Sequence, residues 1–219
     1  GQGSVKSNVA EMTARLYGDD DAGGAMIDVT LYDLERNFSE VVKRIISTNG
    51  RNSRIFRLDN VTGVLRSSNL AMLVTESNIT GRPSYGRGEE SRPNNLTFVA
   101  TVNGATVDTD IASRAYYIMV RKPVMSASWA DDIIAYIQQN RFQIFADIID
   151  ILENHHVYAI PLSTRCPKFE ATILQAACGT PELYQLACEF IANKKDETNT
   201  DEELARQIEE KLEVHLADV

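Results

Sequence analysis

The chain has 219 residues, of which 43% are hydrophobic and 24% charged, which is enough apolar material for one sizeable core with a small helical addition. Its net charge of −9 argues against a protein that coats nucleic acid with its whole surface, since that mode of binding needs a broad basic face. No apolar run reaches about 18 residues, so we expect neither a membrane span nor secretion, and the cytoplasm is the expected location. The three cysteines are widely spaced and form no CxxC pair, which argues against a disulfide framework or a zinc site.

The first half of the chain alternates between helix and strand patterns. Runs with an apolar face or a serine cap predict helices over residues 5–17, 32–50, 67–77 and 108–114. The helix over residues 32–50 is expected to stop at Asn49-Gly50. Short apolar and β-branched runs predict strands over residues 25–31, 54–60, 96–104 and 115–123. This alternation predicts a mostly parallel sheet that is covered on both faces.

After Pro123 the strand signal nearly disappears, and helical patterns follow to the end of the chain. They cover residues 129–156, 167–179, 180–194 and 200–216. We therefore expect an α/β core over residues 1–125 and an all-helical lid over residues 126–219.

Two predicted strands end in polar residues that suit nucleotide chemistry. The strand over residues 54–60 ends at Asp59, and a carboxylate at the carboxyl edge of a sheet can hold a water molecule on Mg²⁺. The next long strand ends with Thr101 and Asn103, which we expect at the same edge. Arg114 follows eleven residues after Asn103, where its guanidinium can reach a phosphate in a neighbouring subunit. The order Asp, Asn, Arg is more specific than any one of these residues.

Residues 54–86 and 93–120 resemble the AAA+ ATPase module of phage, plasmid and mobile-element primase-helicases, a superfamily 3-like helicase domain. The resemblance covers roughly residues 35–190. It implies a P-loop-type sheet with a helical lid, ATP and Mg²⁺ as cofactors, and a role for each of several residues. These are Asp59 with Asn60 as Walker B, Asn103 as sensor 1, Arg114 as the arginine finger and Arg165 as the sensor 2 analogue.

The same family expects a phosphate loop of the form GxxxxGK[ST], and this chain starts GQGSVKSN. The resemblance places Gly3 in the loop, Lys6 on the phosphates and Ser7 on Mg²⁺, with a helix following. Val5 replaces the glycine before the lysine. The strand that precedes the loop in this family is not found before Gly1, and three explanations stay open: the natural protein continues upstream, another segment or subunit takes its place, or the nucleotide site has degenerated. The alternative interpretation is that the first residues are a remnant of processing and that an ordinary helix follows them.

A basic segment, GRPSYGRGEESRPNN, separates the helix predicted over residues 67–77 from the strand predicted over residues 96–104. Its arginines are Arg82, Arg87 and Arg92, and a hairpin there would present these cations to DNA phosphates. In the family a loop at this place lines the central channel of a ring. The alternative is a solvated loop whose arginines pair with Glu89 and Glu90.

Together these features predict an ATP-dependent DNA helicase or translocase that acts in replication of a phage or mobile element. We expect a homo-oligomeric ring that binds ATP between subunits and acts on single-stranded or duplex DNA. Whether the chain is an enzyme depends on a functional phosphate loop. The alternative is a non-hydrolysing AAA+-like scaffold that assembles replication proteins, which Val5, Asn60 and the missing first strand favour.

Overall fold

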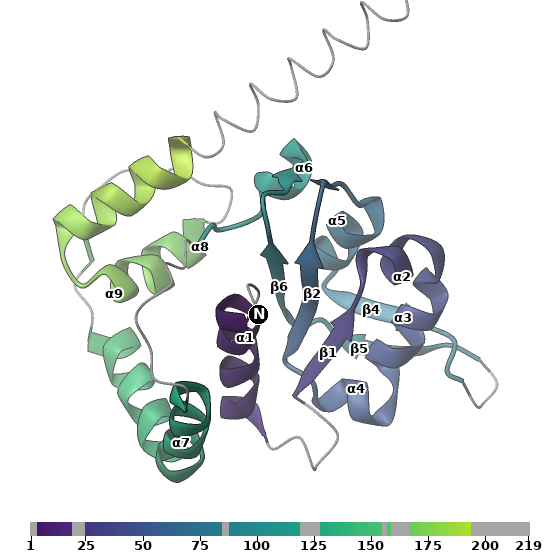
Figure 1. Ribbon diagram of the computed structural model, residues 1–219, viewed down its shortest axis with the longest axis horizontal. Coiled ribbons are helices and arrows are strands. Elements are labelled where there is room, and N and C mark those ends of the chain that lie inside the picture. The colour runs from purple at the N-terminus through teal and green to yellow at the C-terminus, as the bar shows by residue number, and fades with distance from the viewer. Residues whose placement is uncertain are drawn as a thin grey trace, which may run out of the picture. The chain divides into compact units, whose positions relative to one another are not determined.

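The computed structural model describes residues 4–18, 25–84, 88–118, 128–154, 157–158 and 167–193 (Figure 1). The chain divides into two compact units. The first comprises residues 1–105 and 119–145, and the second comprises residues 106–118 and 146–219.

The first unit is built on a three-stranded parallel sheet. Its strands are β1 (Met26–Val29), β2 (Ile55–Val61) and β6 (Thr97–Val102), in the order β1-β2-β6. The central strand β2 has Ile55, Phe56 and Leu58 almost fully buried, because helices cover the sheet on both faces. The predicted α/β class, the parallel pairing and these three strands are confirmed.

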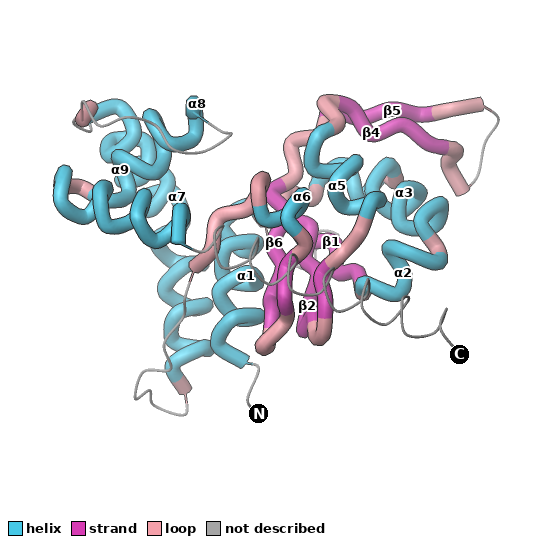
Figure 2. Tube along the Cα trace, turned by 90° about the horizontal axis from the view of Figure 1, so that it is seen from above, coloured by secondary structure: helices cyan, strands magenta, loops and turns pink. Residues whose placement is uncertain are grey.

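Helices lie on both sides of this sheet, as Figure 2 shows. On one side is α1 (Ser4–Tyr17), which places Ala14 in a small buried cluster with Ala25 and Ile55. Small side chains on this face of α1 allow the helix to lie close to the sheet. On the other side are α2 (Leu31–Arg36), α3 (Phe38–Ile46) and α5 (Ser68–Thr75).

The single helix predicted over residues 32–50 is wrong, because the chain forms α2, α3 and a third short helix, α4 (Thr48–Asn52). The Ser47 hydroxyl accepts a hydrogen bond from the Gly50 backbone at 3.0 Å and so begins α4. Gly50 does not end a helix. It lies buried within α4, where a Cβ would stand 1.9 Å from the Arg44 carbonyl oxygen, so only glycine allows this approach.

A hairpin stands apart from the parallel sheet. After the short strand β3 (Val64–Leu65) and α5, the strands β4 (Asn78–Gly81) and β5 (Glu90–Pro93) pair in antiparallel register. Figure 2 shows the pair extending beyond α3 and α5. The hairpin that the sequence analysis considers for this segment is therefore present, and its strand β4 packs on α3, where Gly81 leaves room for the Val42 side chain.

The second unit begins with β7 (Thr106–Val107) and α6 (Thr109–Ala112), which Asp108 caps. The strand predicted over residues 115–123 is wrong for residues 115–118, which are neither helix nor strand, and its remainder lies outside the described residues. The predicted domain boundary near residue 125 also lies outside them.

The described residues after 128 contain helices and no strand, in line with the helical patterns of the sequence. A long helix, α7 (Trp129–Asn154), comes first. Then α8 (Pro167–Phe169), a π-helix (Glu170–Leu174) and α9 (Gln175–Cys178) follow, and residues 181–193 are helical. The helix predicted over residues 200–216 lies outside the described residues. Within those residues, none of the helices combines the length and apolar character that crossing a membrane requires.

Candidate functional site

Three segments of the first unit meet at the carboxyl edge of the parallel sheet. The first turns of α1 bring Lys6 and Ser7, the end of β2 brings Asp59, and the end of β6 brings Thr101 and Asn103. The carboxyl ends of parallel strands share one edge of a sheet, which is where such folds bind ligands. Residues as far apart in sequence as Lys6 and Asn103 therefore touch.

The carboxylate of Asp59 lies at the centre of this group. One of its oxygens, Oδ1, accepts a hydrogen bond from the Ser7 hydroxyl at 2.6 Å and another from the Thr101 hydroxyl at 2.6 Å. Partial burial acts to raise the pKa of Asp59, but these two hydrogen bonds and the nearby Arg57 charge outweigh it and hold the pKa below its usual value. Asp59 is thus an ionised acceptor at neutral pH.

Lys6 is linked to the same edge through Asn103. The Lys6 ammonium donates to the Val102 carbonyl at 2.6 Å and to the Asn103 Oδ1 at 3.0 Å. The Asn103 Nδ2 in turn donates to the Asn60 Oδ1 at 2.7 Å. A chain of polar contacts therefore runs from α1 across β6 to β2, with the ammonium at one end.

The backbone of Asn60 is unusual. Its φ of 55° is positive, which no other described residue apart from glycine adopts. The pairing of β2 with β6 shifts in register between Leu58 and Val61, and the Asn60 N–H donates to the Thr101 hydroxyl at 2.8 Å. Such irregularities redirect side chains at the rims of sheets, and strained residues of this kind gather at functional sites.

The oxygen donors at this edge fit a magnesium ion that is bound together with phosphates. Ser7 and Asp59, predicted as Mg²⁺ ligands, offer a hydroxyl and a carboxylate in contact. Mg²⁺ typically uses one or two carboxylates and completes its shell with water and phosphate oxygens. The part of the chain that the structure describes contains no cluster of three or more His, Cys, Asp or Glu side chains suited to a metal. A Mg²⁺ ion held here would need oxygens from phosphate or water beside those of Ser7 and Asp59.

Sequence reasoning missed Arg57, which lies on β2 two residues before Asp59. Its guanidinium pairs with the Asp28 carboxylate at 2.5 and 2.8 Å and donates to the Ser7 carbonyl at 3.1 Å. The signal that indicates this residue is an arginine between the apolar residues Phe56 and Leu58, on the same face of the strand as Asp59.

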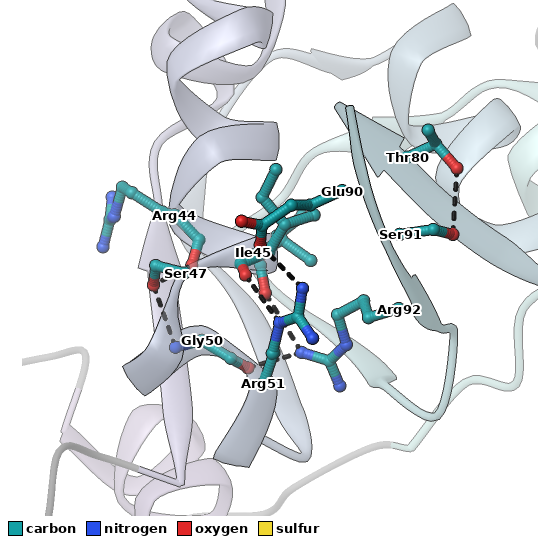
Figure 3. Close-up of polar contacts among 10 residues, drawn as sticks. Arg44, Ile45, Ser47, Gly50, Arg51, Thr80, Glu90, Ser91 and Arg92 are labelled. Carbon is teal, nitrogen blue, oxygen red and sulfur yellow. Dashed lines mark hydrogen bonds and ion pairs between the residues drawn. The ribbon is translucent and has the colours of Figure 1, made fainter. Parts of the chain in front are cut away.

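Arg92 was predicted to contact DNA, and that prediction is wrong. The residue is 3% exposed and points from β5 into the protein (Figure 3). Its guanidinium donates to the carbonyl oxygens of Ile45, Gly50 and Ser53 near the ends of α3 and α4, where a cation is favoured. Burial, with the nearby charges of Arg54 and Arg51, lowers the Arg92 pKa. The hydrogen bonds of Arg92 therefore hold the hairpin against α3 and α4.

Three other charged residues of the hairpin segment are Arg82, Arg87 and Glu90. Arg82 is exposed next to the end of β4, so its contact with DNA stays a prediction. The carboxylate of Glu90 pairs with Arg51 of α4 at 2.7 Å, which adds a second link between hairpin and helices (Figure 3). Arg87 lies outside the described residues.

The remaining predicted site residues are not part of the group at the sheet edge. Gly3 and Arg165 lie outside the described residues. Arg114 belongs to the second unit, where its guanidinium pairs with Asp110 at 2.7 Å. Its predicted role toward a neighbouring subunit stays a prediction.

Comparison with protein-family models, curated proteins and solved structures finds no match to this chain. The resemblance to AAA+ modules therefore remains a hypothesis that is based on the sequence motifs. The contacts among Lys6, Ser7, Asp59 and Asn103 are the structural argument that can be added to it.

Proposed function

We propose that the first unit binds Mg²⁺-ATP at the carboxyl edge of its sheet. The chain would be the AAA+ P-loop module of a DNA helicase or translocase that acts in replication of a phage or mobile element. The observation that carries this proposal is the contact of Lys6 and Ser7, on one helical turn, with Asn103 and Asp59 at two strand ends. A cation, a hydroxyl and a carboxylate at a helix start form the donor set that a metal-bound triphosphate needs.

Each residue has a role in this proposal. Lys6 exchanges its contacts with Val102 and Asn103 for phosphate oxygens, and the N-terminal end of α1 adds its positive dipole. Ser7 and Asp59 hold Mg²⁺, which neutralises phosphate charge when bound. Asn103 orients the attacking water, and Arg114 reaches the nucleotide of the next subunit in a homo-oligomeric ring.

A second candidate function is a non-hydrolysing scaffold that assembles replication proteins. It is favoured by Asn60, which occupies the position next to Asp59 where a catalytic carboxylate would be expected. An amide cannot accept a proton at neutral pH, and the Asn60 side chain is engaged with Asn103 at 2.7 Å. This candidate predicts nucleotide binding without turnover.

The first test measures binding of a fluorescent ATP analogue in the presence of Mg²⁺. We expect Lys6→Ala to weaken binding at least about tenfold, because a charged hydrogen bond to phosphate is lost. Lys43→Ala is the matched control, since Lys43 lies on α3 and pairs with Glu40. No binding by the wild-type chain would overturn the proposal.

Phosphate release and DNA unwinding then separate the two candidates. Turnover that Asp59→Ala abolishes supports the ATPase, whereas binding without turnover supports the scaffold. For the helicase, we expect turnover to rise with single-stranded or forked duplex DNA. Arg82→Ala should reduce this stimulation, and Arg36→Ala, which alters an exposed arginine of α2, should not.

A further inference from the structure

The face of the sheet that packs against the first turns of α1 contains a charged residue, Arg57 of β2. Side chains two positions apart on a strand face the same side of a sheet, so Arg57 and Asp59 both face α1. The Arg57 side chain is 12% exposed and reaches the Ser7 backbone, with Nη1 donating to the carbonyl oxygen at 3.1 Å. One strand thus contacts Ser7 twice, at its carbonyl through Arg57 and at its hydroxyl through Asp59.

Asp28 fixes the plane of this guanidinium. It is the register partner of Arg57 across β1 and β2, and it accepts from Nε at 2.5 Å and from Nη2 at 2.8 Å. A bidentate pair of this kind defines the direction of the remaining Nη1 donors, as a lysine could not. Those donors are then aimed at α1.

A cation near the start of a helix is electrostatically unfavourable by itself, because the first turn carries the positive end of the helix dipole. Arg57 occupies this place because the carboxylates of Asp28 and Asp59 compensate it. An ion pair whose Asp28 partner is 50% exposed contributes little to stability. A role in positioning Ser7 accounts for the arrangement better than stability does.

We propose that Arg57, held by Asp28, is a positioning residue that fixes the first turns of α1 so that the Ser7 hydroxyl meets Asp59. The inference rests on the proposed Mg²⁺-nucleotide function of that site. Arg57 acts through Ser7, and its effect on binding depends on Mg²⁺.

The test compares Arg57→Gln with wild type by binding of the fluorescent ATP analogue, once with Mg²⁺ and once with EDTA. We expect about tenfold weaker binding with Mg²⁺ and unchanged binding in EDTA, because the lost contact orients only the metal-binding hydroxyl. In a Ser7→Ala background the same change should add nothing, since residues that act as one unit are not additive. The proposal would be overturned if Arg57→Gln weakened nucleotide binding equally with and without Mg²⁺. It would also be overturned if the effects of Arg57→Gln and Ser7→Ala on binding were additive.

Two control variants separate positioning from folding. Arg54→Gln removes another arginine of the same segment, whose contacts are with the Arg51 and Ser53 carbonyls, and should leave binding unchanged. The exchange of charges in Asp28→Arg with Arg57→Asp keeps an ion pair between β1 and β2 but removes the Arg57 hydrogen bond to the Ser7 carbonyl. Thermal stability of this double variant should stay close to that of wild type while the Mg²⁺-dependent loss of binding remains. Wild-type binding by the double variant in the presence of Mg²⁺ would contradict the proposal.

Amide hydrogen exchange gives a readout without nucleotide. In Arg57→Gln, amides over residues 8–11 should exchange about tenfold faster, while those of β2 and α3 keep their rates, because only the first turns of α1 are released. If wild type fails to bind nucleotide but this pattern appears, the proposed function fails and the positioning stands. If wild type binds and the exchange of α1 is unchanged, the positioning is wrong and the proposed function stands.

Discussion

The Ser7 hydroxyl donates a 2.6 Å hydrogen bond to the Asp59 carboxylate and so joins the first turns of α1 to the end of β2. The same carboxylate oxygen accepts from Thr101 at 2.6 Å, which adds the end of β6. A single ionised group therefore connects three elements of the first unit. The stability of this edge of the sheet depends on the charge of Asp59.

Stability should accordingly fall in acid through Asp59. Its pKa is lowered in the folded protein, so its contribution is fully present above its unfolded pKa of about 4 and is lost as the pH falls through the folded pKa. We expect the free energy of unfolding of wild type to exceed that of Asp59→Asn at pH 7 and the gap to narrow below about pH 4. Urea denaturation of both proteins across this range measures the gap, and a gap that is independent of pH would contradict the assignment.

Removal of the Thr101 hydroxyl should destabilise the same edge. Thr101 is buried, and its hydroxyl donates to Asp59 and accepts from the Asn60 N–H. We expect Thr101→Val, which keeps the shape, to lower the free energy of unfolding by about 1–3 kcal/mol, because the part-buried Asn60 N–H loses its acceptor and the Asp59 carboxylate loses a donor. Thr97→Val at an exposed position of the same strand is the control. The Asp59 pKa, followed by NMR titration, should rise in Thr101→Val only.

The sheet and its polar edge could be predicted because they depend on local patterns. Apolar runs indicated β1, β2 and β6, and the parallel arrangement then placed Asp59 and Asn103 at one edge. The breaks between α2, α3 and α4 were missed because the apolar periodicity continues across Asn37 and Ser47. In the fold, the Ser47 side chain caps α4, whereas Asn37 makes no side-chain cap and separates α2 from α3 through its non-helical backbone, with φ −124° and ψ 35°.

The roles of two arginines depend on tertiary contacts, which composition does not specify. Arg92 lies in a polar segment like Arg82, but its alternation on β5 turns it inward onto the carbonyls of α3 and α4. Arg57 acquires its partner from the strand register, which sets it opposite Asp28. A charge count along the chain treats all of these residues as surface.

Replacement of Arg92 should destabilise the packing of the hairpin on α3 and α4. We expect Arg92→Met to lower the free energy of unfolding by about 2–4 kcal/mol, because several buried carbonyl oxygens lose a charged donor at once. Arg82→Met, at an exposed position of the same segment, should change it by less than about 0.5 kcal/mol. Chemical denaturation of both variants gives the comparison. Equal effects would show that the Arg92 contacts contribute nothing.

Asn60→Asp tests whether the residue beside Asp59 limits hydrolysis. Aspartate has nearly the same size, tolerates the positive φ of 55°, and its oxygen can still accept from the Asn103 Nδ2. The substitution therefore keeps the local geometry and adds a carboxylate that can accept a proton from water. We expect phosphate release to rise at least about tenfold at saturating Mg²⁺-ATP, a small part of the usual contribution of a general base. Asn78→Asp adds the same charge at an exposed position of β4 and should leave the rate unchanged. If Asn60→Asp binds nucleotide as wild type does but releases phosphate no faster, the missing base is not what limits turnover.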